Sequence, residues 1–468
     1  MINGNILLIA LIGLMLVATV NANALIVKGI YADSQGTSFA IAENGSLWVL
    51  GRFEGVDYSH PVMVPFIDDV AMVAPVGEGS AVVLKDDGTV WAWGSTFSNE
   101  TAGYLGQNRT TPVQSDITDV KYISSGSGAI YAIKNDSTLW AWGRNCEFNA
   151  TGALLYGCLG IPDFKDYRTL VPMRVPIDNV STVLARDVVI VQKSDGSWWG
   201  WGDNTYYELL DGTSERRNQP EQLSIDENIA QLSSSFMGNV LALTGNGTVL
   251  TWGSNSHGQA GDPGVPSPMT HPYRVPGMSD VLSVGSGLTF SVALKEDGTV
   301  WIWGGASQSY NRAHGTLESD KPIQVPGLSG IVSITVGAEH CFAIKKDGTI
   351  WAFGRDQNGE LGDGQILDPL ATGNTGMPLG VRVNDVNFDT SYLSGQTTNT
   401  SKPSPSPLAT PGDYIPVGST SPAPISSSPK DTPISTQTNG FDFMTIAALL
   451  GLGLTGSIVC STRRRRKL

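Results

Sequence analysis

Short apolar runs alternate with polar turns along most of the chain, and one pattern recurs seven times between Ala42 and Gly354. Each copy has a turn dipeptide, then an aromatic-rich strand, then a glycine seven residues after the dipeptide begins. The closing glycines follow one another at intervals of 43, 49, 59, 51, 51 and 50 residues. A period near 50 with four strands per unit is typical of propeller blades, and seven copies can close a ring. The pattern predicts an all-β, seven-bladed β-propeller over residues 25–394.

The strands of one repeat follow from its apolar runs. In the sixth repeat, the four strands are predicted at residues 281–284, 290–294, 300–303 and 322–325. The pair Asp297-Gly298 predicts a type I′ hairpin between the second and third strands. A proline recurs where each fourth strand is expected to begin, at Pro61, Pro112, Pro172, Pro220, Pro272, Pro322 and Pro378. Because proline cannot donate to a strand ladder, the fourth strand is predicted to be the outer edge of its blade.

Tryptophans are concentrated on the third strand, two residues apart, as in Trp91 and Trp93 or Trp301 and Trp303. Such a count could indicate stacking on carbohydrates or bases. The regular repetition favours a structural interpretation, in which the rings wedge between neighbouring blades.

The repeated units resemble a known family. The segments LKDDGTVWAWG, LKEDGTVWIWG and IKKDGTIWAFG, and NGELGDG at residues 358–364, are similar to the regulator of chromosome condensation repeat. The resemblance covers roughly residues 25–390 and is nearest to a prokaryotic secreted branch that includes a protein inhibitor of β-lactamase. It implies a seven-bladed ring that binds protein partners through its faces. The nucleotide-exchange role of the nuclear member depends on an added wedge and a basic histone-binding face, and the acidic charge and predicted secretion of this chain argue against both.

Both ends of the chain have the composition of targeting segments. Residues 1–24 contain an apolar stretch followed by Ala22-Asn23-Ala24, which predicts a cleaved secretory signal. The usual positive charges before the apolar stretch are missing, so an uncleaved N-terminal anchor is the alternative. Within residues 441–468, an apolar segment precedes the cluster Arg463–Lys467. This order predicts one C-terminal transmembrane helix with everything before it outside the cell.

The segment between ring and membrane differs in composition. Residues 395–440 are rich in proline, serine and threonine and poor in charge, which predicts a disordered stalk. The following Asn439-Gly440-Phe441, apolar span and arginine cluster resemble an archaeal sorting signal whose leading motif reads Pro-Gly-Phe. Asn439 replaces the proline of that motif, so a retained transmembrane anchor and transfer to a lipid both remain open.

Composition excludes several classes of function. The net charge is −14 although five basic residues lie together near the C-terminus, so binding to nucleic acid is not expected. The five histidines are scattered singly, no catalytic motif is present, and no catalytic residue, cofactor or metal site is predicted. The segment from Asp356 to Glu360 faintly resembles a calcium loop, but it also matches the usual turn of the repeat.

Two kinds of covalent modification are compatible with an extracellular location. Cys146 and Cys158 lie in one loop and are predicted to form a disulfide, with two separate thiols as the alternative. Cys341 falls in a predicted core strand and is interpreted as a small buried apolar residue. Eight N-x-Ser/Thr sequons are present, and those in predicted loops or the stalk are the candidate glycosylation sites: Asn99, Asn108, Asn149 and Asn399. Asn44 and Asn246 lie in hairpin turns, and turn chemistry explains them without sugar.

Loop length indicates which face binds. From each closing glycine to the next strand-opening proline there are 10, 18, 29, 18, 19, 18 and 24 residues, whereas the hairpins opposite are short. Variable loops on a rigid scaffold are where binding usually resides. Tyrosine and arginine dominate binding hot spots. The candidate anchors on these loops are Tyr104, Phe148, Tyr156, Tyr206, Tyr207, Arg216, Arg217 and Tyr310.

These observations predict a surface propeller of a prokaryotic, archaeal-type cell that acts as a binding or adhesion module. The expected partner is an extracellular protein or glycan, and the expected membrane attachment is the C-terminal helix or a lipid. The alternatives are an extracellular polysaccharide lyase or hydrolase on a propeller scaffold, and an architectural component of the envelope.

Overall fold

The computed structural model describes residues 25–32, 36–77, 80–94, 109–126, 128–148, 154–225, 227–235, 237–305, 319–366 and 380–388. They belong to one compact unit, Met1–Pro416, and the second unit, Val417–Leu468, lies outside them. The predicted signal, stalk and transmembrane helix also lie outside the described residues. No helix long and apolar enough to cross a membrane occurs in these ranges.

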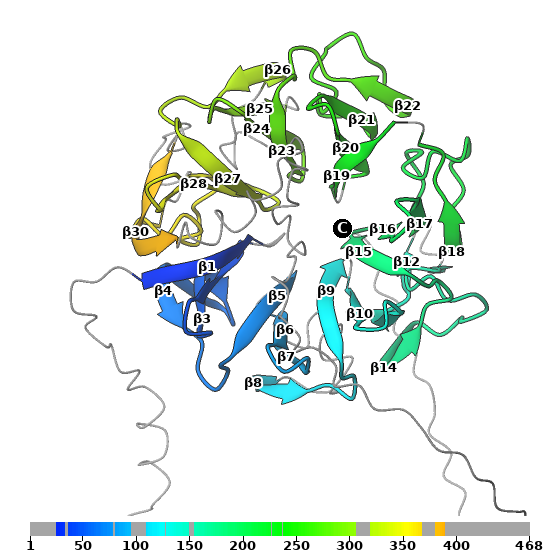
Figure 1. The fold of residues 1–468 in the computed structure, drawn as a ribbon, viewed down its shortest axis with the longest axis horizontal. Helices are drawn as coiled ribbons and strands as arrows, with labels where there is room; N and C mark the ends of the chain where they lie inside the picture. The colour runs from blue at the N-terminus through cyan, green and yellow to red at the C-terminus, as the bar shows by residue number, and fades with distance from the viewer. Residues whose placement is uncertain are drawn as a thin grey trace, which may run out of the picture. The chain divides into compact units, whose positions relative to one another are not determined.

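The described strands form seven blades of four antiparallel strands each, arranged as a ring in Figure 1. Blade 1 comprises β1 (Leu25–Ala32), β2 (Thr37–Ala42), β3 (Leu47–Phe53) and β4 (Val56–Met63). Blade 2 comprises β5 (Val70–Gly77), β6 (Ser80–Lys85), β7 (Val90–Gly94) and β8 (Arg109–Gln114). Blade 3 comprises β9 (Val120–Gly126), β10 (Ala129–Lys134), β11 (Leu139–Arg144) and β14 (Arg168–Arg174), with the added hairpin β12 (Cys146–Phe148) and β13 (Leu154–Tyr156).

The remaining four blades repeat the same order. Blade 4 comprises β15 (Val180–Ala185), β16 (Val188–Lys193), β17 (Trp198–Gly202) and β18 (Arg217–Gln222). Blade 5 comprises β19 (Ile229–Ser234), β20 (Asn239–Thr244), β21 (Val249–Gly253) and β22 (Met269–Arg274). Blade 6 comprises β23 (Val281–Ser286), β24 (Phe290–Lys295), β25 (Val300–Gly304) and β26 (Ser319–Gln324). Blade 7 comprises β27 (Ile331–Val336), β28 (His340–Lys345), β29 (Thr349–Gly354) and β30 (Val381–Phe388). The all-β propeller prediction is confirmed.

Burial explains the strand order within a blade. Every residue of the middle strand β20 is buried, because this strand is covered on both faces by neighbouring blades. The outer strand β18 contains no buried residue and consists of Arg, Asn, Gln, Pro and Glu. The apolar clusters draw their side chains from adjacent blades, as in the cluster that joins Leu209 and Leu223 of blade 4 to Trp252 of blade 5. The core of the protein therefore lies between the blades.

The hairpin between the second and third strands differs from the predicted type I′ turn. A type I′ turn requires positive φ at both central residues. Gly298 has a φ of 77°, whereas Asp297 is not among the residues with positive φ. The Gly298 N–H donates to the carbonyl of Lys295 at 2.9 Å, and the Lys295 N–H donates to that of Thr299 at 3.0 Å. The loop therefore has three residues, with a glycine bulge after the first turn, so the predicted turn type was wrong.

The prolines of the fourth strands also lie elsewhere than predicted. Pro272 is inside β22 rather than at its start. The ladder pairs Thr251 with Tyr273 and Gly253 with Met269, so three residues of β22 lie opposite Trp252 alone. A bulge accommodates a residue that lacks an N–H donor. In blades 1 to 6, the prediction that the fourth strand forms the blade edge is confirmed, and the prediction that proline begins it is wrong. In blade 7, β30 pairs with β1, and Pro378 lies outside the described residues.

A parallel strand pair closes the ring. Leu25, Ile26 and Val27 of β1 pair with Val386, Asn387 and Phe388 of β30. This pairing, here called the clasp, joins blades 7 and 1 into one eight-stranded sheet. In Figure 1, the outer end of β1 meets β30 at the rim. The clasp thus ties the first described strand to the last.

Candidate binding face

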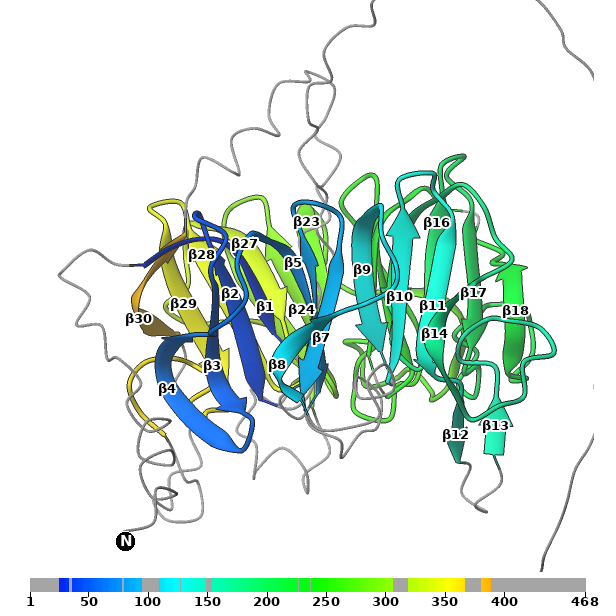
Figure 2. The ribbon, with the colours of Figure 1, turned by 90° about the horizontal axis from the view of Figure 1, so that it is seen from below.

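The two faces of the ring are built differently. On one face, here called the hairpin face, lie the turns between second and third strands and the crossovers between blades. On the other, the loop face, lie the connections between third and fourth strands. Figure 2 shows the β12–β13 hairpin extending beyond the strands of its blade. The loop face is therefore the face with irregular projections.

The hairpin face is uniform because one polar contact recurs in every blade. The Asp297 Oδ1 atom accepts from the Thr299 N–H at 2.9 Å and from the Thr299 hydroxyl at 2.6 Å. The Trp301 Nε1–H then donates to the same hydroxyl at 2.9 Å. In all seven blades, the side chain of an aspartate or asparagine accepts from the backbone N–H two residues later. These acceptors are Asn44, Asp87, Asp136, Asp195, Asn246, Asp297 and Asp347. Lysines also lie over the partly buried tryptophans, such as Lys345 over Trp351 at 4.1 Å.

The second tryptophan of a pair is buried, and in blades 4, 5 and 6 it links two blades. Trp252 of blade 5 donates its Nε1–H to the carbonyl of Glu208 in blade 4 at 2.8 Å. Trp303 of blade 6 donates to the carbonyl of Gln259 in blade 5 at 2.8 Å. These contacts support the structural interpretation of Trp252 and Trp303, whose ring nitrogens are used within the fold, whereas the Nε1 atom of Trp142 is buried without a hydrogen-bond partner.

Two of the long loops share an asparagine two positions after the closing glycine, which is buried in blade 4 and partly buried in blade 5. Asn204 in blade 4 accepts from the Leu209 N–H at 2.9 Å and donates to the carbonyl of Thr213 at 3.0 Å. Asn255 in blade 5 accepts from the Ala260 N–H at 2.8 Å and donates to the carbonyl of Val265 at 2.7 Å. These side chains replace the backbone partners that an irregular loop lacks. The loops are therefore rigid where they leave the blade.

Blade 7 carries an aspartate at the same place. Asp356 Oδ1 accepts from the Leu361 N–H at 3.1 Å, and its Oδ2 is buried without a hydrogen-bond partner. Burial is the main reason that its pKa rises to about 7, with Asp363 and Glu360 contributing. The Glu360 carboxylate accepts from the backbone N–H of Asn358 at 2.6 Å and from its side-chain amide at 2.7 Å. These contacts match a turn, and no cluster of three potential metal ligands occurs among the described residues.

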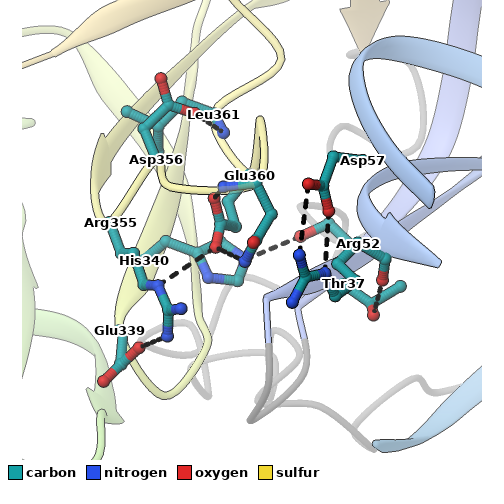
Figure 3. Close-up of polar contacts among 11 residues, drawn as sticks. Thr37, Arg52, Asp57, Glu339, His340, Arg355, Asp356, Glu360 and Leu361 are labelled. Carbon is teal, nitrogen blue, oxygen red and sulfur yellow. Dashed lines mark hydrogen bonds and ion pairs between the residues drawn. The ribbon is translucent and has the colours of Figure 1, made fainter. Parts of the chain in front are cut away.

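Charged side chains at the junction of blades 7 and 1 are paired with one another (Figure 3). Arg355 lies between Glu339 and Glu360, with its Nε atom 3.4 Å from Glu360 Oε1. His340 is fully buried, its Nε2 atom lies 2.7 Å from the Ser38 hydroxyl, and its pKa falls to about 3 because of burial and then Arg355. Neutral His340 thus links the two blades through Ser38, whereas the ion pairs of Arg355 lie within blade 7.

Glu208 occupies the position that Gln259 occupies in blade 5. Glu208 Oε2 accepts from the Tyr206 N–H at 2.8 Å, and Gln259 Oε1 accepts from the His257 N–H at 2.9 Å. Burial raises the pKa of Glu208 to about 8, and Asp203 contributes. The protein therefore favours the protonated carboxyl at neutral pH.

We expect Glu208→Gln to stabilise the protein in alkaline solution and to change little in acid. Because the folded pKa of about 8 exceeds the ordinary value of 4.5, stability falls as pH rises between these two values. Glutamine keeps the acceptor and removes the ionisation, so the gain above the folded pKa is on the order of 1–3 kcal/mol. Chemical denaturation across this pH range measures it. An equal effect at both ends of the range would contradict the argument, and Gln259→Glu should show the opposite change.

The structure brings four of the proposed anchors together in the blade 4 loop. Tyr206 and Tyr207 are partly buried, and Tyr207 adopts a φ of 67°. Arg217 contacts Asp211 at 2.6 Å and Glu221 at 3.0 Å. Arg216 lies 3.8 Å from Asp203 and donates to Cys158 Sγ at 3.4 Å. The two arginines therefore stiffen the loop, and the acidic residues within the same loop are the signal that could have indicated their pairing.

The side chains of the other candidate binding residues and of the glycosylation sites lie outside the described part of the chain. Phe148 and Tyr156 lie on β12 and β13, whose side chains are outside the described part of the chain. Tyr104 and Tyr310 lie outside the described residues, as do the four proposed glycosylation sites, Asn99, Asn108, Asn149 and Asn399. Gly157, just after β13, approaches Asn218 of blade 4 closely, since a β-carbon on it would lie 2.6 Å from the Asn218 Cβ. The inserted hairpin thus ends next to the blade 4 loop.

The two loop cysteines lie close in the backbone. The Cys158 N–H donates to the carbonyl of Asn145, the residue before Cys146, at 3.2 Å. The Cys146 side chain lies outside the described residues, so the disulfide stays a prediction. Cys341 is buried in the core between blades 6 and 7, and burial raises its thiol pKa, in agreement with the apolar interpretation.

Comparison with known proteins agrees with the fold. Models of the regulator of chromosome condensation (RCC1) repeat match residues 229–259, 331–360 and 246–294. The chain is 31% identical over 115 residues to the RCC1 domain-containing protein RUG3, mitochondrial, of Arabidopsis thaliana, covering 24% of this chain and 26% of that protein. It is 27% identical over 259 residues to the E3 ubiquitin-protein ligase HERC2 of Homo sapiens, covering 52% of this chain and 5% of that protein. The matches thus span a small part of both relatives.

Solved structures show the same architecture. Prp20p from Saccharomyces cerevisiae superposes with a TM-score of 0.58 at 17% identity, covering 76% of this chain and 87% of that chain. Human WBSCR16 superposes with a TM-score of 0.58 at 18% identity, covering 75% and 94%. The seven blades, the turn residue that recurs in each of them and the matched repeats lead to one conclusion: the chain is a seven-bladed β-propeller that contains regulator of chromosome condensation repeats.

Proposed function

We propose that the protein is a cell-surface propeller that binds a protein or glycan through its loop face. The observation that supports this most directly is the contrast between the faces. All seven described hairpin turns use the same side-chain contact, whereas the loops opposite range from the two-residue turn Glu54-Gly55 in blade 1 to the long insertion in blade 3. Variation in length on a fixed scaffold is typical of recognition surfaces.

Related propellers support a protein partner. The structure of Prp20p was described together with its binding properties to Gsp1p and histones, and yeast RCC1 has been solved with Kap60 bound. The acidic charge of this chain does not suit a nucleic-acid partner. Anchoring outside a prokaryotic, archaeal-type cell is part of the proposal and is supported by the composition of the two end segments.

The binding sector is proposed at blades 3 and 4. The blade 4 loop is stiffened by the buried Asn204 and by the ion pairs of Arg216 and Arg217. A stiff loop loses little conformational entropy on binding, so aromatic rings mounted on it can contribute fully to affinity. Tyr206 and Tyr207 are the described aromatic residues of this loop that remain partly accessible.

We expect Tyr206→Ala combined with Tyr207→Ala to weaken binding by on the order of tenfold or more, while the melting temperature changes little. The probe is envelope extract from the source cells, followed by quantitative binding of the captured component to the purified protein. Phe66→Ala is the matched control, because Phe66 is 80% exposed on a crossover at the hairpin face. Equal losses in both variants, or a loss that follows unfolding, would contradict binding through the loop face.

The same material distinguishes the alternatives. Turnover of cell-wall polymers by the purified ring would favour the extracellular lyase or hydrolase. Specific retention without turnover favours the binding module. Failure to retain any envelope component would favour an architectural role.

A further inference from the structure

The turn at the hairpin face requires an acceptor oxygen, which aspartate and asparagine both supply. Asn44 Oδ1 accepts from the Ser46 N–H at 3.0 Å and from its hydroxyl at 2.7 Å. Asp347 Oδ1 makes the same pair of contacts with Thr349, at 2.9 Å and 2.6 Å. Five blades have aspartate at this position, and blades 1 and 5 have asparagine followed by glycine: Asn44-Gly45 and Asn246-Gly247.

We propose that Asn44 and Asn246 are sites of spontaneous deamidation that the folded turns suppress. In this reaction the backbone nitrogen of the glycine attacks Cγ of the asparagine. A new C–N bond forms, the bond from Cγ to the side-chain nitrogen breaks, and ammonia leaves with the displaced proton. Water then opens the cyclic imide to aspartate or to isoaspartate. Glycine favours the attack because it has no β-carbon to hinder the approach.

The native turn holds both reacting groups in other contacts. The Gly45 N–H donates to the carbonyl of Ala42 at 2.9 Å, and the Gly247 N–H donates to that of Thr244 at 2.9 Å. Asn246 Oδ1 lies 2.5 Å from the Thr244 hydroxyl and 3.0 Å from the Thr248 hydroxyl. Cyclisation breaks these contacts, so its rate follows the fraction of time that the hairpin is open.

The two products have different consequences. Aspartate reproduces the turn of the other five blades. In isoaspartate the main chain continues through the side-chain carboxyl carbon, so the backbone is one carbon longer. The extra carbon displaces the following glycine. The carbonyls of Gly45 and Gly247 accept from Val70 N–H at 2.9 Å and Val281 N–H at 3.0 Å. Isoaspartate at these turns therefore loosens the junctions of blades 1–2 and 5–6.

The test follows deamidation by peptide mass spectrometry in the purified full chain, kept folded or unfolded in denaturant, in mildly alkaline buffer. We expect both sites to react faster when unfolded, by on the order of tenfold or more. Asn204, which precedes Thr205, is the slow internal reference in the unfolded chain. Equal rates in the two states, or no reaction at either site in the unfolded chain, would overturn the proposal.

Local variants separate turn opening from general unfolding. Ser46→Ala removes one hydrogen bond to Asn44 Oδ1, so it should accelerate deamidation at Asn44 in the folded protein and leave Asn246 unchanged. Asn44→Asp should fold with an unchanged melting temperature, whereas the isoaspartate-containing fraction, detected by enzymatic methylation, should melt earlier. Acceleration of both sites by Ser46→Ala, or equal melting of both products, would contradict local control by the turn.

Discussion

Gly253→Ala is expected to destabilise the propeller by about 2–5 kcal/mol. Gly253 has a φ of 89°, which costs an alanine about 1–2 kcal/mol. A β-carbon there would also overlap the carbonyl oxygen of Gly238, and overpacking of this kind costs roughly another 1–3 kcal/mol. The change in denaturant midpoint at constant slope measures the sum.

Gly212→Ala is the matched control for this substitution. Gly212 lies in the loop face with a φ of 79°, and a β-carbon added to it would meet nothing within 4 Å. The control should show the backbone cost alone. If both variants lose the same stability, the close approach of Gly253 to its neighbouring strand is not what requires glycine.

Val386→Asp is expected to open the clasp between β1 and β30. Val386 is 2% exposed and packs in the cluster that joins blades 7 and 1. A buried, unpaired carboxylate costs roughly 3–5 kcal/mol, and the clasp has only three residue pairs to resist it. Hydrogen exchange should therefore accelerate in β1 and β30 first.

The exposed Arg382 on the same strand supplies the control, as Arg382→Asp adds the same side chain without burying it. We expect its exchange pattern to match the unmodified protein. Faster exchange spread evenly over all blades in Val386→Asp would show that the ring opens as a whole and that the clasp is not the weak point.

Much of this fold could be predicted because each blade repeats a local signal. The spacing of Asp297, Thr299 and Trp301 is set by one turn and one strand face, so it is visible within five residues. The turn type could not be read in the same way, since Asp-Gly suits both a two-residue and a three-residue hairpin. What separates them is the φ of the aspartate, which the residue pair alone does not set.

The functional surface was less accessible to sequence analysis. Arginine was selected by residue type, and the pairing of Arg217 with Asp211 depends on how the loop folds back. The raised pKa of Glu208 likewise arises from packing against the next blade, where Gly238 leaves room for its carboxylate. The pairing of Arg217 has no periodic signal, because it belongs to one loop, and the position shared by Glu208 and Gln259 does not by itself indicate a buried carboxylate. The sequence predicts which loops vary in length, but it does not predict the contacts within each loop.

The clasp also sets an order of events during synthesis. β1 is made at the beginning of the ring, but its partner Val386–Phe388 is made after all other blades. Until then one edge of β1 has no strand beside it, and unpaired edges are the sites at which nascent chains pair wrongly. Contacts between such distant segments form slowly. A growing chain therefore spends nearly the whole time of its translation as an open arc, and chaperones that shield strand edges should matter most before the last blade emerges.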